Sequence, residues 1–525
     1  MHNATKHVSD TMRMPIIIVP AAILSESLTY SAARADAGYA KKVMHMGKAL
    51  TVIVVLAIIL ALVLVFSPRT PASPAITDAR YVSFSQGDDA HDGTSPDRPW
   101  KTLTKVSQQR FGPGAIIYLR RGDTWNDALI LTGKGNSAAH QWITVKPYGP
   151  ETEANPTIDR SNAADANKDW AIKLVDGEGW RFENIAIKNS KTGLVYLGSD
   201  EKTQKKGLHI SNLTFENIRG LPNHQKNPDE DKRPYWWLRG STAISITGVG
   251  YCKDGLPATD EHCSGGKYFS IGSYGASLSD VTIEDVTIRN ATYGIWVWGA
   301  GFTGVGKNYR IARPHVVRAG IGGIEMSFVE NALVSDPKIE YVGGDTIWSG
   351  TFGIDVNYVQ NVTIQGGEVA YTLGEVFYEG EGTGINLNGP NTVTIKGVQL
   401  HNNDGSAIAI QGATLPDRAV YEFSENRIWD NARKNDNPAP GQYEYPEFIT
   451  IIHLNSSSAA TIKNNMIKVK PNRHLIVIAR DLVSPDIWKD EFSSDYRLPD
   501  YSFCDNRDSA QTNAPLIAGD KECGS

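Results

Sequence analysis

The sequence predicts an all-β protein built as a parallel β-helix, a solenoid with three strands in each coil. The main observation is a short strand that recurs down the C-terminal two-thirds of the chain. Its copies are GLVYLG from residue 193, AISITG from 243, GIWVWG from 294, GIEMSF from 323, GIDVNY from 353, GINLNG from 384, AIAIQG from 407, ITIIHL from 449 and LIVIAR from 475. Where no insertion intervenes, successive copies begin 23 to 31 residues apart, which is typical of a repeat architecture.

The second observation concerns the segments between these copies. Val and Ile alternate there with polar residues around an Asn, Asp or Gly, as in LSDVTIEDVTI from residue 278 and VQNVTIQGGEV from 359. This pattern indicates two strands joined by a tight bend, which completes three strands per coil. A β-propeller, the alternative repeat fold, needs blades of about 40 to 50 residues and does not fit the spacing.

Composition and length agree with one large solenoid. The chain has 525 residues, and a stack of coils extends its core in one dimension without a globular limit. Its net charge is −6, with 52 basic and 58 acidic residues and no block rich in lysine or arginine. Nucleic acid is therefore excluded as an expected partner.

An apolar run near the N-terminus predicts one transmembrane helix. Residues 49–67 form a signal-anchor, because about 17 to 25 apolar residues cross a bilayer. Lysines between residues 41 and 48 precede the run, so the positive-inside rule makes residues 1–48 a cytoplasmic tail. A Pro/Ser-rich linker follows at residues 68–78.

The competing interpretation of this run is a cleaved signal peptide, with translation starting at Met44 or Met46. Both interpretations place the solenoid outside the cytoplasm. We expect a single-pass membrane protein, with most of its chain periplasmic or on the cell surface.

The four cysteines all lie in the exported part. Cys252 lies near Cys263 in one insertion, and Cys504 lies near Cys523 at the C-terminus. Because an oxidising compartment allows such local pairs to close, we expect two structural disulfides.

The entrance to the solenoid, residues 79–150, has a distinctive sequence. It contains YVS from residue 81, GDDAHDGTSPDRPWKTL from 87 and PGAIIYLRRGDTW from 113, with the amphipathic stretch TLTKVSQQ from 102 between strand-like pieces. A helix in that stretch would cover the open end of the first coil. These motifs resemble the N-terminal cap of the pectate-lyase-like superfamily of right-handed parallel β-helix proteins, which includes polysaccharide lyases, glycoside hydrolases and uronate epimerases.

The resemblance implies a right-handed parallel β-helix over residues 151–500. An insertion at 221–240 and a predicted disulfide loop at 251–264 interrupt it, and a disulfide-stapled tail occupies 501–525. The resemblance specifies the fold more closely than the reaction, because one fold hosts several chemistries.

The exposed face of the recurring strand carries the candidate site. Alternation directs its aliphatic residues inward, so the residues between them are expected to face solvent in two columns. The first column is Ser245, Trp296, Glu325, Asp355, Asn386 and Ala409, and the second is Thr247, Trp298, Ser327, Asn357, Asn388 and Gln411.

Glu325 and Asp355 are the predicted catalytic pair. They occupy the same position in consecutive coils, so their Cα atoms are expected about 4.8 Å apart. Two carboxylates so close repel each other, which creates an acid beside a base. Retaining glycosidases hold their carboxyl pair about 5 to 5.5 Å apart, so this spacing suits a nucleophile and an acid/base. Outward polar residues are often merely solvated, but like charges directly opposite destabilise a sheet and therefore indicate a purpose.

Residues around the pair are predicted to bind substrate. Asparagine side chains can hydrogen-bond sugar hydroxyls, tryptophans offer flat faces to sugar rings, and acidic or aromatic loops often carry binding groups. The predicted substrate-binding residues are Trp296, Trp298, Asn357, Asn386, Asn388, Gln411, Trp348, Tyr378, Glu379 and Glu381. Glu379 or Glu381 is also an alternative acid.

Calcium is the alternative occupant of the site. Its ligands would be Glu325, Asp355, Asn357 and Asn386, because calcium prefers clustered carboxylate and amide oxygens. Lyases of the resembled superfamily use calcium to acidify a uronate, with Lys or Arg as base. The two columns hold neither residue type, so Arg318 or Lys338 would have to take that role.

Two further features are expected to be structural. The YWWLR segment of the insertion carries Trp236 and Trp237, which pack against the coils or stack on a sugar at the groove edge. His315 lies in a different strand of its coil from the carboxylate pair and is predicted not to act as a base.

We therefore predict a membrane-anchored, monomeric β-helix enzyme that degrades or modifies a polysaccharide, most simply a glycoside hydrolase without a cofactor. The alternatives are a calcium-assisted lyase or uronate epimerase, and a non-catalytic carbohydrate-binding or envelope-scaffold protein.

Overall fold

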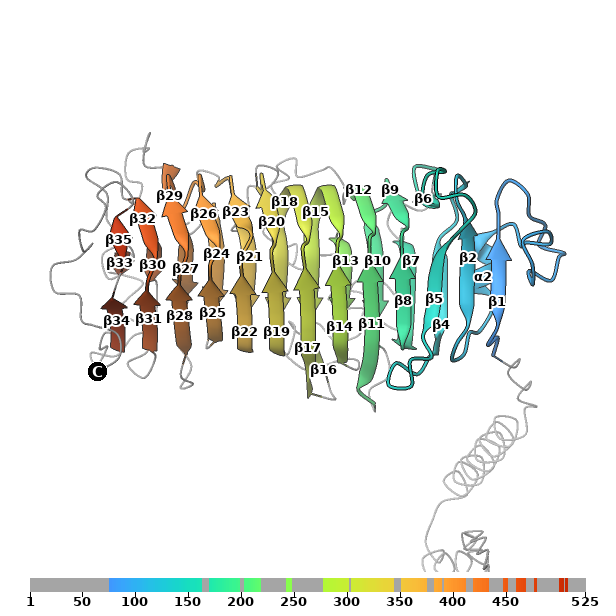
Figure 1. Ribbon diagram of the computed structural model, residues 1–525, viewed down its shortest axis with the longest axis horizontal. Helices are drawn as coiled ribbons and strands as arrows, with labels where there is room; N and C mark the ends of the chain where they lie inside the picture. Colours follow the sequence, from blue (N-terminus) through green and yellow to red (C-terminus); the bar gives the residue numbers. More distant parts are fainter. Residues whose placement is uncertain are drawn as a thin grey trace, which may run out of the picture. The chain divides into compact units, whose positions relative to one another are not determined.

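The computed structural model divides the chain into two compact units, Met1–Ser73 and Pro74–Ser525, and every residue that it describes lies in the second. It describes residues 75–162, 170–198, 203–218, 242–247, 277–301, 304–343, 351–374, 382–389, 391–411, 419–433, 447–451, 459–468, 476–478, 500–504 and 506–508. The strands of this unit stack as successive coils (Figure 1).

The first face of the coils is a parallel sheet in which each strand pairs with its equivalent in the next coil. Its strands are β1 (Ala79–Val82), β2 (Ile116–Arg120), β5 (Ile143–Tyr148), β8 (Trp180–Glu183), β11 (Lys205–Ser211), β14 (Leu278–Glu284), β17 (Gly304–Ala312), β19 (Val329–Ser335), β22 (Gln360–Gln365), β25 (Thr392–Lys396), β28 (Val420–Ser424), β31 (Ala459–Lys463) and β34 (Asp500–Cys504). The short β16 (Ala300–Gly301) pairs antiparallel with β17.

The second face contains the recurring strands found in the sequence, preceded by two strands of the first coils that the recurring motif did not include. They are β4 (Leu129–Lys134), β7 (Trp170–Glu178), β10 (Thr192–Leu197), β13 (Thr242–Thr247), the C-terminal parts of β15 (Thr287–Trp298) and β18 (His315–Ser327), β21 (Phe352–Asn357), β24 (Thr383–Asn388), β27 (Ile408–Gln411), β30 (Ile449–Ile451) and β33 (Ile476–Ile478).

The third face joins the first face to the second within each coil. Its strands are β3 (Thr124–Trp125), β6 (Thr157–Asp159), β9 (Ala186–Lys188), β12 (Thr214–Ile218), the N-terminal parts of β15 and β18, β20 (Lys338–Glu340), β23 (Glu368–Ala370), β26 (Gln399–His401), β29 (Arg427–Trp429), β32 (Met466–Lys468) and β35 (Arg507–Asp508). The predicted three-stranded coil is therefore confirmed.

The tight bends between first-face and third-face strands place a residue in the left-handed region of backbone conformation. Asp336 (φ 49°) occupies it between β19 and β20, and Asn464 (φ 56°) occupies it between β31 and β32. Asn and Asp tolerate this conformation better than other residues with a side chain, which explains the Asn/Asp signal at the bends.

Aliphatic ladders fill the interior. Ile295, Ile324, Ile354, Ile385 and Ile408 are register partners in successive coils and are fully buried. Each such side chain stabilises the fold by roughly 1.5 to 3 kcal/mol relative to an exposed one. The alternation read from the sequence therefore placed the core correctly.

A short helix lies at the N-terminal end of the coils. The helix α2 (Leu103–Ser107) is N-capped by Thr102, whose hydroxyl accepts a hydrogen bond from the Lys105 amide at 3.0 Å. Leu103 and Val106 are buried in the core, and the Ser107 hydroxyl accepts a hydrogen bond from the Ile130 amide of β4. The amphipathic stretch predicted as helical is therefore a helix.

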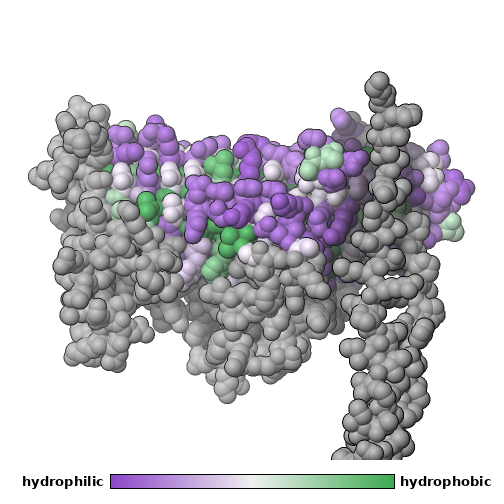
Figure 2. Space-filling view, turned by 90° about the horizontal axis from the view of Figure 1, so that it is seen from below, coloured by the Kyte–Doolittle hydropathy of each residue, from purple (hydrophilic) through white to green (hydrophobic). Residues whose placement is uncertain are grey.

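The predicted membrane anchor at 49–67 lies outside the described residues, and within them no helix is long and apolar enough to span a bilayer. Neither predicted disulfide can be followed, because Cys252, Cys263 and Cys523 also lie outside and only the backbone of Cys504 is described. The described surface seen in Figure 2 is mostly hydrophilic, with small apolar patches.

Candidate carboxylate site

Glu325 and Asp355 are register partners on the adjacent strands β18 and β21. Both predicted columns are confirmed along the second face, because pairing continues residue by residue from β13 to β27. The sequence analysis therefore identified the correct neighbours for each side chain.

The expected solvent exposure is wrong for the whole first column and for Thr247, Ser327 and Asn357 of the second. Glu325 is only 1% exposed, Asp355 5% and Trp296 6%. These side chains point away from the interior of the coils, but they pack and hydrogen-bond with one another. Because a buried carboxylate is costly unless donors compensate it, the surrounding hydrogen bonds are essential to the site.

One chain of hydrogen bonds connects the two carboxylates. The Ser327 hydroxyl donates to Oε1 of Glu325 at 3.4 Å, and the amide Nδ2 of Asn357 donates to the Ser327 hydroxyl at 3.1 Å. The same amide nitrogen donates to Oδ2 of Asp355 at 2.9 Å. The two carboxylates are therefore joined through two neutral side chains of the second column.

Each carboxylate has a further donor in the neighbouring coil of its own column. The indole Nε1 of Trp296 donates to Oε1 of Glu325 at 3.2 Å. The amide Nδ2 of Asn386 donates to Oδ1 of Asp355 at 2.8 Å. The network therefore spans β15, β18, β21 and β24.

Three residues predicted to bind sugar thus direct their donors at the carboxylates. Trp296 uses its indole nitrogen, and Asn357 and Asn386 use their amide nitrogens. A buried carboxylate is a stronger acceptor than a neutral group, so it takes these donors. The carbonyl Oδ1 of Asn386 is buried and has no hydrogen-bond partner among the described residues, so it can accept from a ligand hydroxyl.

An aromatic row borders the network. Trp298 lies 4.7 Å from Phe328 between ring centroids, and Phe328 stacks on Tyr358 at 5.2 Å. Phe328 and Tyr358 were not predicted as site residues, although both directly follow the recurring strand in GIEMSF and GIDVNY. An aromatic residue at the same place in consecutive copies was the available signal.

Other predicted binding residues are outside the network or outside the described residues. Asn388 is half-buried in the second column. Trp348, Tyr378, Glu379 and Glu381 are outside the described residues, as are Trp236 and Trp237, and only the backbone of Gln411 is described.

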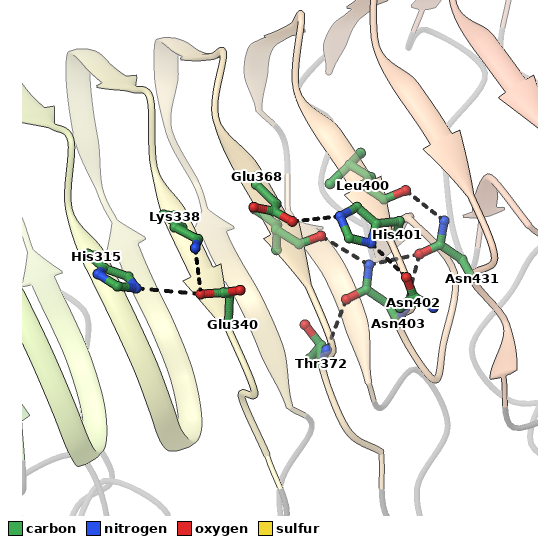
Figure 3. A network of polar contacts seen from close by, with 11 residues as sticks. His315, Lys338, Glu340, Glu368, Thr372, Leu400, His401, Asn402, Asn403 and Asn431 are labelled. Atoms are coloured by element: carbon green, nitrogen blue, oxygen red, sulfur yellow. Dashed lines mark hydrogen bonds and ion pairs between the residues drawn. The ribbon is translucent and has the colours of Figure 1, made fainter.

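A separate polar cluster occupies the third face (Figure 3). His315 Nε2 lies 3.5 Å from Oε2 of Glu340, which also pairs with Lys338 at 3.1 Å. In the next coils, Glu368 Oε1 lies 2.7 Å from Nε2 of His401. His315 and Lys338 therefore interact with third-face residues and are not part of the carboxylate network.

The orientation of two amide groups bears on the calcium alternative. Asn357 and Asn386 turn their amide nitrogens toward Asp355, whereas calcium would need their oxygens. Within the described residues, no group of three or more His, Cys, Asp or Glu side chains is placed to hold a metal ion.

The stacked coils and their second-face columns define a right-handed parallel β-helix protein. The resemblance to the pectate-lyase-like superfamily is confirmed at the level of fold. A family model described as right handed beta helix region matches residues 269–468.

Two lacto-N-biosidases are among the known proteins to which the chain is similar. The chain is 40% identical to a lacto-N-biosidase from Bifidobacterium longum subsp. longum over 80 residues, which are 15% of this chain and 5% of that protein's length. The crystal structure of a GH136 lacto-N-biosidase from Eubacterium ramulus matches 82% of this chain and 68% of its own, with 17% identity and a TM-score of 0.52. This structural match shows the fold alone.

Proposed function

We propose that the protein is a glycoside hydrolase in which Glu325 and Asp355 are the catalytic carboxylates. The observation that carries the proposal is their pairing on adjacent strands inside a buried hydrogen-bond network. Burying two carboxyl groups side by side is expensive, so a chain that keeps both and surrounds them with donors has a use for them.

The proposed reaction has two steps. Asp355 attacks the anomeric carbon while protonated Glu325 gives its proton to the leaving glycosidic oxygen, which breaks the glycosidic bond. Glu325, now ionised, then removes a proton from water, and the water oxygen displaces Asp355 from the sugar. The products are the released alcohol of the leaving group, a free sugar with retained configuration and the original enzyme. Adjacent-strand spacing of about 4.8 Å suits the short carboxyl separation of this mechanism.

The substrate that we propose is an uncharged glycan. From Ser245 to Gln411 the two columns contain carboxylates but no lysine or arginine, so a uronate would meet negative charge without a counter-ion. Asn386 Oδ1 is an acceptor and would receive a sugar hydroxyl. Because both relatives are called lacto-N-biosidase, a glycoside of lacto-N-biose is the first compound to test.

The remaining sequence-based predictions are retained as proposals. They are an N-terminal signal-anchor at 49–67, an extracytoplasmic location, a monomer, two disulfides, and α2 as part of a cap on the first coil. They rest on the apolar run, the cysteine positions and the amphipathic helix described above.

Mass spectrometry of products tests the function. The purified full chain would be incubated with p-nitrophenyl lacto-N-bioside, neutral oligosaccharides and uronate polymers. We expect fragments that have gained one water, and loss of at least a thousandfold in rate for Glu325→Gln and Asp355→Asn. Unsaturated fragments whose formation stops with EDTA would indicate the calcium-assisted lyase instead, and binding without any product would indicate a carbohydrate-binding protein.

A further inference from the structure

Asn357 and Asn386 hold the two oxygens of Asp355 from different positions of the sheet. Asn357 lies on the same strand, two residues beyond Asp355, and donates to Oδ2. Asn386 is the register partner of Asp355 on β24 and donates to Oδ1. The plane of the carboxylate is thus fixed by donors on both of its oxygens.

Both amides are themselves held in place. Asn357 is 8% exposed and uses one amide nitrogen for two acceptors, the Ser327 hydroxyl and Asp355. An amide nitrogen carries two hydrogens, so these two bonds use both of them and set the orientation of the amide. Asn386 is 2% exposed, so its side chain is confined as well.

We propose that Asn357 and Asn386 are positioning residues that keep Asp355 ionised and aimed for attack. This inference rests on the proposed function and goes beyond it, because it assigns the attacking role to Asp355 and the supporting role to these two amides. Donors on both oxygens favour the charged form of a carboxylate over its acid form. They also restrict its rotation, and orientation of a nucleophile contributes directly to rate.

The two asparagines differ in whether they also offer an acceptor to the substrate, and an experiment can separate these roles. Asn357 interacts with Ser327 and Asp355, so it acts through its neighbours. Asn386 also presents the buried carbonyl Oδ1 that lacks a partner within the described part of the chain. Asn386 therefore supports Asp355 and in addition contacts the substrate, whereas Asn357 only positions.

The test is steady-state kinetics of the full chain against pH with p-nitrophenyl lacto-N-bioside, or with the neutral substrate that the product screen identifies. For Asn357→Ala we expect kcat to fall about tenfold to a hundredfold with KM unchanged, since a hydrogen bond to a charged group is lost. For Asn386→Ala we expect a similar fall in kcat together with a rise in KM. In both variants the acidic limb of kcat against pH moves to higher pH.

Two further variants serve as controls for misfolding and for unspecific effects of substitution. Asn386→Asp keeps the shape of the side chain but places a carboxylate beside Asp355, so the acidic limb is expected to move further than in Asn386→Ala. Gln399→Ala removes an exposed amide on β26, outside the network, and is expected to keep the wild-type profile.

The positioning role would be overturned if Asn357→Ala and Asn386→Ala kept the wild-type kcat and the wild-type acidic limb while Asp355→Asn was inactive. The proposed function would then remain intact. Full activity of Asp355→Asn would overturn the proposed function and this inference together.

Discussion

The indole nitrogen of Trp296 lies 3.2 Å from the carboxylate of Glu325, its register partner in the next coil. Trp296 therefore serves as a hydrogen-bond donor in the column where the sequence indicated a stacking platform. Because both residues are almost fully buried, water cannot readily replace this bond when it is lost.

Trp296→Phe tests this relationship, because it keeps an aromatic ring and removes the donor. We expect the free energy of unfolding to fall by about 1 to 2 kcal/mol, because a buried acceptor loses a donor, and kcat to fall at least tenfold. Urea denaturation and product assays measure the two effects. Trp142→Phe is the matched control, because Trp142 lies outside the network beside Arg181 and His209. Equal effects of both substitutions would show that the hydrogen bond from Trp296 to Glu325 makes no particular contribution to stability or activity.

Gly389→Ala tests the end of the aromatic row. Gly389 has φ +82°, and a Cβ there would lie 2.7 Å from the Tyr358 ring. We expect a loss of stability of about 2 kcal/mol or more, since backbone strain and a displaced ring add together. Gly304→Ala is the control, because Gly304 has φ +102° and no atom of the described residues lies within 4 Å of its Cβ position. The difference in melting temperature between the two variants isolates the contact with Tyr358, and no difference would mean that the ring moves without cost.

Asn465→Ala tests the asparagine ladder that joins the last coils. Asn465 Nδ2 donates to the Phe423 carbonyl at 2.9 Å and to Asn506 at 2.8 Å, and its Oδ1 accepts from the Asn426 amide at 2.9 Å. We expect the free energy of unfolding to fall by about 2 to 4 kcal/mol, because buried backbone and amide groups lose their partners. Gln360→Ala, an exposed amide on β22, is expected to change stability by less than about 0.5 kcal/mol. Equal denaturation midpoints would contradict the prediction.

Asp89→Asn tests the acid sensitivity of the N-terminal region. Burial raises the pKa of Asp89, but hydrogen bonds from Thr102 and Lys101 lower it more, so the pKa lies below its ordinary value of 3.8. A lowered pKa in the folded state contributes stability above the unfolded pKa and loses it as pH falls. The variant is therefore expected to be less stable than wild type at pH 7, by about 1 kcal/mol, and the gap should close below about pH 4. A gap that stays constant between pH 7 and pH 3 in denaturation experiments would refute this.

The sequence predicted which residues of the site are neighbours on adjacent strands. It did not predict how buried they are or which hydrogen bonds they make. The pairing of Glu325 with Asp355 follows from counting residues within GIEMSF and GIDVNY, because each copy begins at the same place in its coil. The hydrogen bonds of Asn357 and Ser327 could not be predicted, because alternation assigns side chains to a face without giving their rotamers. The expected exposure was wrong for the same reason.

The sequence by itself determined the coil, its three strands, the tight bends at Asn, Asp or Gly between two of them, and the isoleucine ladders. These features depend on local periodicity and on the few residues that tolerate a left-handed backbone. Only the tertiary structure decided that the carboxylates are buried and that Trp296, Asn357 and Asn386 direct their donors at them. The physical reason is that burial and hydrogen bonding depend on which side chains from neighbouring coils meet, and at what angle.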